Sequence, residues 1–182
     1  PTRFNGVIYF FGTGMPGHIL LALEIIAIWI PLAFHAIYGM MIIGRGDPNY
    51  FTTKYKWSQN LMYSLQRYSG IFILFFLIYH VYTTTVTAKL QGESAIQFAA
   101  WHDKLAGFHY AGLALYVLGI AAASYHLSYG VWNFCIRWGI TISPKSQIAV
   151  QKFAMVMFIA VTLLGWIALA GFLMPHADVI SV

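Results

Sequence analysis

Charge is what this sequence has least of. Only 8% of its 182 residues are Asp, Glu, Lys or Arg, whereas 60% are hydrophobic. A soluble domain carries about 25% charged residues, so this composition excludes that class and predicts an integral membrane protein. The formal net charge of +5 does not indicate nucleic-acid binding, because the basic residues gather near the ends of the hydrophobic runs.

Cysteine is almost absent as well. A single residue, Cys135, excludes an internal disulfide and cannot by itself hold an iron–sulfur cluster. The chain also lacks a nucleotide-binding pattern. Residues 1–14 do not show the basic and then apolar pattern of a signal peptide, and we expect that the N-terminus was processed or that residues precede Pro1.

The sequence does contain long hydrophobic runs. Four of them reach the about 20 residues that cross a bilayer. They predict one all-α domain over residues 1–182, an up-and-down transmembrane helix bundle. Basic residues cluster in the first and third loops, which the positive-inside rule assigns to the cytoplasm, with both termini outside. The predicted spans are about 17–43, 60–87, 105–134 and 147–174.

Two histidines lie at matching depths in these spans. His35 precedes Ile43 by eight residues, and His126 precedes Phe134 by eight, so each lies about 12 Å inside the cytoplasmic end of its helix. Level imidazoles on different helices are the arrangement that binds a haem iron from both sides. The alternative is two unrelated histidines hydrogen-bonded inside the bundle. Ligation is favoured because ionisable groups inside a membrane are usually functional.

Arg67 lies on the same side of the membrane as this pair. It is seven residues beyond Asn60, about 10 Å into its helix, where a guanidinium needs an anion. A haem propionate is a good candidate because it accepts the paired hydrogen bonds of arginine. The alternative is an arginine that extends to the lipid headgroups.

His80 is predicted near the outer face, and no histidine of this chain matches it well. His18 and His109 are outer residues, but each is seventeen positions from His35 or His126, about 100° around its helix. A helix that aims one histidine at an inner haem would therefore aim the other elsewhere. His80 either has a partner outside this chain or is structural.

Glu24 is the other costly group on the outer side. A carboxylate at this depth is expected to be protonated, paired or part of a proton path. The remaining histidines are expected to be ordinary interfacial residues. These are His18, His102, His109 and His176.

Three stretches resemble a known family. Residues 23–42, 65–81 and 125–147 contain the histidine, glutamine–arginine and tryptophan-glycine-isoleucine-threonine motifs, and they resemble the dihaem cytochrome b558 membrane anchor of succinate dehydrogenase. The resemblance covers nearly the whole chain in order. It implies five helices and four haem ligands, with His35 and His126 on the inner haem and His80 on the outer one.

The family's first helix, which supplies the fourth histidine, has no counterpart here. Residues 1–17 correspond to the loop after it. We therefore expect that the chain lacks its first helix, and that the partner of His80 lies outside residues 1–182. The alternative is a four-helix variant with one haem.

The resemblance implies an electron-transfer and quinone-reducing subunit of succinate dehydrogenase. It would anchor a flavoprotein and an iron–sulfur subunit, which oxidise succinate, on the cytoplasmic face of a bacterial cytoplasmic membrane. Electrons would pass through haem b to a quinone, with menaquinone favoured by the resemblance, and Glu24 could transfer protons near an outer quinone site. The alternatives are the anchor of a quinol:fumarate reductase and a cofactor-free transporter that uses Glu24.

Overall fold

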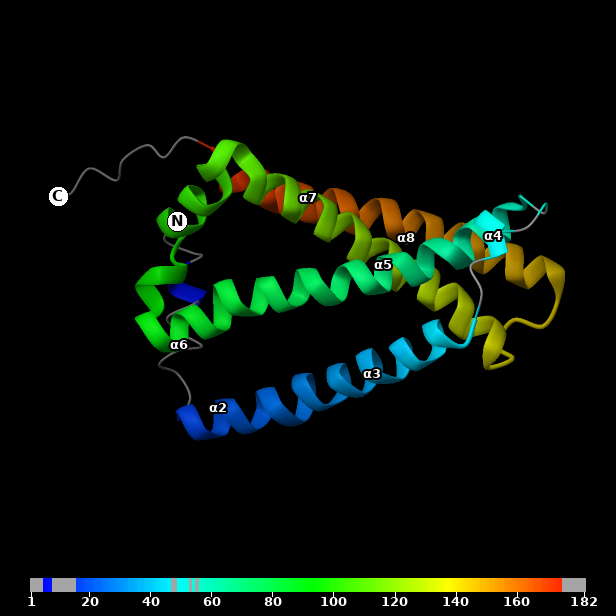
Figure 1. Cartoon of the computed structure of the whole chain (residues 1–182), viewed down its shortest axis with the longest axis horizontal. Coiled ribbons are helices and arrows are strands. Elements are labelled where there is room, and N and C mark those ends of the chain that lie inside the picture. Colours follow the sequence, from blue (N-terminus) through cyan, green and yellow to red (C-terminus); the bar gives the residue numbers. More distant parts are fainter. Residues whose placement is uncertain (1–4, 8–15, 47–48, 53, 55, 175–182) are drawn as a thin grey trace.

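The computed structural model of the chain describes residues 5–7, 16–46, 49–52, 54 and 56–174. Every regular element within these ranges is helical. Four helical stretches are long and apolar enough to cross a membrane, and they run alternately up and down (Figure 1). The all-α membrane bundle predicted from the hydrophobic runs is therefore confirmed. The four stretches are Gly17–Gly44, Ser58–Gln91, Phe98–Arg137 and Pro144–Gly171.

The first span consists of α2 (Gly17–Glu24), a π-helical segment η1 (Ile25–Trp29) and α3 (Ile30–Gly44). Pro31 lies where η1 passes directly into α3, inside one continuous span, and because it has no N–H it leaves a carbonyl of the preceding turn without its helical hydrogen bond. No residue of this span is buried. The first span is therefore the least enclosed of the four.

The second span is α5 (Ser58–Val81), followed by a second π-helical segment, η2 (Tyr82–Val86), and by α6 (Thr87–Gln91). It extends beyond the predicted residues 60–87 at both ends. A short helix, α4 (Asn49–Thr52), lies in the first basic loop. Single π-helical turns are rare and are often found at functional sites.

The third span, α7 (Phe98–Arg137), follows the short 3₁₀ helix η3 (Glu93–Ile96) and comprises two helices on either side of residues 107–110. Its helical path is broken at Gly107, and the next three residues have φ angles of 48°, 56° and 60°. Left-handed residues cost about 1–2 kcal/mol each unless they are glycine. The angle of about 100° between His109 and His126 was calculated for one continuous helix. It therefore does not hold across this break.

The fourth span is α8 (Pro144–Gly171). Ser143 and Ser146 form a reciprocal capping box at its start, and Pro144 occupies the first turn. The box satisfies backbone donors that a helix start leaves free. This start lies three residues before the predicted one because the cap, rather than the apolar run, sets the helix boundary.

Small residues set the packing of the last three spans. A side chain at Gly119 of α7 would lie 2.5 Å from the Phe76 ring of α5, and one at Gly165 of α8 would lie 2.5 Å from Ile120 of α7. Close approach at small residues is typical of membrane helices. α7 packs on both α5 and α8, whereas α2 and α3 lie on the other side of α5 (Figure 1).

Candidate functional site

A cavity of about 380 Å³ lies between α3, α5 and α7. This volume is within the range of about 300–1,000 Å³ that is usual for ligand sites. Its wall is apolar except for two histidines, a glutamine and an arginine. The lining residues that bear on the chemistry are His35, Gly39, Gln66, Arg67, Gly70 and His126.

The structure brings the two level histidines together. The ring centres of His35 and His126 are 6.0 Å apart and the ring planes are inclined by 82°. Imidazole nitrogens on opposite sides of one metal ion, each about 2.0 Å from it, would place the ring centres roughly 6 Å apart. The pair therefore has a separation that suits one metal ion held between two imidazoles.

His126 is held by α5 through its ring and through its backbone. Its Nδ1 lies 3.2 Å from the Gln66 carbonyl oxygen and 3.2 Å from Ser69 Oγ. Gln66 Nε2 in turn donates to the His126 carbonyl over 3.1 Å. A ring N–H donated to a carbonyl leaves the other nitrogen, Nε2, with a lone pair for a metal. His35, by contrast, is exposed.

Gly70 has no side chain and so leaves room for the His126 ring. A Cβ at Gly70 would lie 2.9 Å from Cε1 of the His126 ring and 3.4 Å from its Nδ1. Any larger residue would push the ring away. Across the cavity, a Cβ at Gly39 would meet nothing within 4 Å. Gly70 is thus in close contact with a histidine ring, whereas Gly39 borders open space.

Arg67 lines the same cavity, as the sequence predicted for a residue at this depth. Its Nη1 donates to the carbonyls of Gly46 over 2.6 Å and of Ile43 over 3.2 Å. Its Nη2 donates to the Tyr63 hydroxyl, and its guanidinium lies 4.4 Å above the Tyr63 ring. The guanidinium thus binds the carbonyl end of α3, which favours a cation.

The oxygen of the Gln66 carboxamide is also informative. Oε1 is buried and accepts no hydrogen bond from the described residues. A buried acceptor without a donor costs about 1–3 kcal/mol. Because Gln66 lines the cavity, a donor carried by an occupant of the cavity would satisfy this atom.

His80 belongs to a different cavity, of about 180 Å³, nearer the other end of the bundle. Its Nδ1 lies 3.1 Å from the Tyr116 hydroxyl, and its ring lies 6.0 Å from that of Phe76. No second histidine lines this cavity among the described residues. Whether His80 has a partner outside the chain or is structural therefore stays a prediction.

Glu24 lines the cavity with His80 and is ion-paired. Lys89 Nζ lies 2.7 Å from Glu24 Oε2. Of the three states considered for Glu24, the structure has the paired one. Both π-helical segments contribute to the same wall, through Trp29 and Thr84.

Lys89, Ser69 and Tyr116 were not predicted from the sequence as partners of these residues. The signal for Lys89 was available, because a lone base and a lone acid on adjacent spans near the outer face are expected to pair. Ser69 and Tyr116 gave no such signal. Hydroxyl groups are common in membrane helices, and only packing shows which of them meet a histidine.

The interfacial histidines need no special role. His18 and His109 are exposed, and His102 has its Nδ1 3.4 Å from the Asp103 carboxylate. His176 lies outside the described residues. Within the described ranges no three His, Cys, Asp or Glu side chains cluster to hold a metal, so a metal bound here would depend on two imidazoles.

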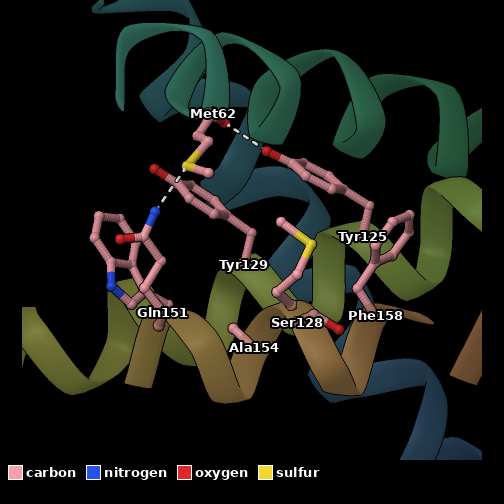
Figure 2. Close-up of a pocket in the computed structure, with 9 residues that line it drawn as sticks. Met62, Tyr125, Ser128, Tyr129, Gln151, Ala154 and Phe158 are labelled. Carbon is pink, nitrogen blue, oxygen red and sulfur yellow. Dashed lines mark hydrogen bonds between the residues drawn. The ribbon is translucent and has the colours of Figure 1, made fainter. Parts of the chain in front are cut away.

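A smaller pocket of about 80 Å³ opens between α5, α7 and α8 (Figure 2). In it the Tyr125 hydroxyl donates to the Met62 carbonyl over 3.0 Å, and Gln151 Nε2 lies 3.5 Å from the Met62 sulfur. The buried Ser128 hydroxyl has no partner among the described residues. These contacts tie three helices together, on a different face of α7 from His126.

The fold and the two cavities define a multi-pass membrane helix bundle with paired imidazoles between its helices. Residues 48–177 match the family described as the succinate dehydrogenase/fumarate reductase transmembrane subunit, and the chain belongs to this family. It is 33% identical over 151 residues to the succinate dehydrogenase cytochrome b558 subunit of Bacillus subtilis (strain 168). The matched residues make up 83% of this chain and 72% of that protein. No solved structure matches it significantly.

Proposed function

We propose that this chain is the haem b membrane anchor of a succinate:quinone oxidoreductase. It passes electrons from an iron–sulfur subunit on the cytoplasmic face to a membrane quinone. The observation that carries the proposal is the pair His35 and His126, whose ring centres are 6.0 Å apart beside a cavity of about 380 Å³. A relative named cytochrome b558 supports haem as the occupant.

The residues around this cavity fit an inner haem b. His35 and His126 would bind the iron, and Arg67 offers a cation for a propionate. Haem b supplies a one-electron carrier when it is bound. The chain's own part is to fix both imidazoles, to exclude water with apolar side chains and to neutralise a carboxylate near the carbonyl end of α3.

His80 is the proposed iron ligand of an outer haem. It faces a second cavity, and its Nδ1 has a hydroxyl partner in Tyr116. The opposite ligand would come from a helix outside residues 1–182. Two haems in line would carry electrons across most of the membrane.

The proposed quinone site lies near the outer face, where Glu24 is the candidate group for proton transfer. Glu24 lines the cavity beside His80 and pairs with Lys89. Reduction of a quinone consumes protons, and an ion pair beside the cavity can hold and release them. Menaquinone is the favoured quinone, by resemblance to the dihaem anchors.

The proposed partners are a flavoprotein subunit and an iron–sulfur subunit, in a bacterial cytoplasmic membrane. Succinate oxidation belongs to these partners. Exposed bases lie in residues 44–57 and 138–152, so we assign the docking of the iron–sulfur subunit to these two stretches. They are Arg45, Lys54, Lys56, Lys145 and Lys152.

Quinol:fumarate reduction is the second candidate, because the family description covers both directions. The name of the relative favours succinate oxidation. A cofactor-free transporter that uses Glu24 is the third candidate. The Lys89 pair gives Glu24 a partner without any transported ion, which speaks against that use.

The test is a reduced-minus-oxidised spectrum of the purified complex, together with its haem-to-protein ratio. His35→Ala and His126→Ala should each remove the inner haem and weaken the association of the peripheral subunits, because cofactor binding stabilises only the folded bundle. A wild-type complex without a haem spectrum would refute the function. Full haem content in both variants would refute the ligand assignment alone.

A further inference from the structure

Ser69 makes an unusual contact for a helical serine. Its Oγ donates to the Gln66 carbonyl three residues earlier over 3.1 Å and also lies 3.2 Å from His126 Nδ1. The same Gln66 carbonyl is 3.2 Å from that Nδ1. Two polar groups of α5 therefore meet at one imidazole nitrogen of α7.

The hydrogens of this cluster can be assigned from its chemistry. A backbone carbonyl only accepts hydrogen bonds, so the contact between Nδ1 and Gln66 requires the ring proton to be on Nδ1. Ser69 gives its own hydrogen to the carbonyl, and its oxygen keeps lone pairs that can accept from the ring. All the contacts are compatible only when Nδ1 carries the proton and Nε2 does not.

We infer that Ser69 is a positioning residue for His126. Together with the Gln66 carbonyl it keeps the ring proton on Nδ1, directs Nε2 to the iron and lowers the reduction potential of the inner haem. The reason is that an acceptor at the ring N–H makes the imidazole a stronger electron donor, which favours the ferric state. The inference rests on the proposed function.

The ordinary alternative is that Ser69 only bonds its own helix, as membrane serines often do. Ser64 shows that case on the same helix. It is fully buried, its Oγ donates to the Asn60 carbonyl over 2.9 Å, and its hydroxyl has no other bond among the described residues. Ser64→Ala is therefore a matched control for Ser69→Ala.

The experiment is a potentiometric titration of the intact purified complex, with haem content and the low-spin electron paramagnetic resonance signal measured on the same samples. His126→Ala identifies the inner haem as the signal that disappears. Ser69→Ala should keep the haem and raise its midpoint potential, by a three- to tenfold change in the ferrous-to-ferric ratio, about 30–60 mV. Ser69→Thr, which keeps the hydroxyl, should restore the wild-type potential, and Ser64→Ala should leave it unchanged.

Three results would overturn the inference. One is an unchanged potential and signal in Ser69→Ala, and another is an equal shift in Ser64→Ala. The third applies if Ser69→Ala loses the haem: Ser69→Thr must then retain it, and loss in both variants would show that the hydroxyl is not what matters. A wild-type complex without haem would instead refute the proposed function, whereas full haem content in His126→Ala would refute the ligand assignment and this inference with it.

Discussion

At the scale of single residues, the site depends on how one ring is held. His126 has hydrogen-bond partners on α5 and a glycine under its edge, whereas His35 is exposed. A ring fixed in rotamer and tautomer binds a metal without further ordering. We therefore propose that the contact between α5 and α7, more than the position of His35, fixes the geometry of the inner metal site.

Gly70→Ala tests this assignment. Its new Cβ would lie 2.9 Å from Cε1 of His126, so the ring must turn and its Nε2 moves with it. Alanine favours a helix over glycine by about 1 kcal/mol, so the helix itself is not weakened. We expect about 10- to 100-fold weaker haem retention, measured as the haem-to-protein ratio during dilution.

The control is Gly171→Ala, where a Cβ meets nothing within 4 Å. It should retain haem like the wild type. Equal retention by Gly70→Ala would show that the ring has room to move and that its position is not set by this glycine.

At the scale of elements, the helices differ in how firmly they pack. α5, α7 and α8 approach closely at small residues, whereas the first span has no buried residue. Both ligand cavities lie between that span and the others. Cofactors bound there would add the contacts that the first span lacks, so haem binding and the packing of this span should be coupled.

Gly119→Ala probes the firm part of the bundle. Its Cβ would lie 2.5–2.7 Å from three atoms of the Phe76 ring, and overpacking of this kind costs about 1–3 kcal/mol. The displaced ring stacks on His80, with its centre 6.0 Å from the histidine ring. We expect a lower thermal midpoint in detergent and a disturbed outer haem.

Gly17→Ala is the control for this variant, because nothing lies within 4 Å of its Cβ. An unchanged midpoint in Gly119→Ala would mean that Phe76 can move aside freely. The contact would then contribute little to the packing of α5 on α7.

At the scale of the whole molecule, the two ends differ in the groups that they carry. One end carries exposed basic residues together with exposed apolar ones, among them Trp138 and Ile142, which are 75% and 84% exposed. The other end carries the Glu24–Lys89 pair and the His80 cavity. This polarity suits entry of electrons at one face and chemistry on a quinone near the other.

A density map of the native complex tests the whole path. We expect the iron–sulfur subunit on residues 44–57 and 138–152, and a histidine from a helix outside residues 1–182 opposite His80. A map with no helix beside His80, or with a helix that has no histidine at that level, would refute the proposal of two haems. If the two basic loops contacted only lipid, the proposal that they dock the iron–sulfur subunit would be refuted.

The sequence by itself determined the class of protein, the four spans of the described residues and the common level of His35 and His126. These properties follow from composition and from position along a helix axis. Depth accumulates at about 1.5 Å per residue, so His35 and His126 could be placed at one level before any packing was known. The same counting placed Arg67 beside them and His80 apart.

Only the tertiary structure decided which groups touch. The Ser69 and Gln66 contacts of His126 and the Glu24–Lys89 pair depend on the direction in which each helix presents a side chain. Direction accumulates at about 100° per residue, so a π-helical turn or the break after Gly107 changes it for every later residue. An irregular turn changes depth by only a few ångströms, which is why levels could be predicted and contacts could not.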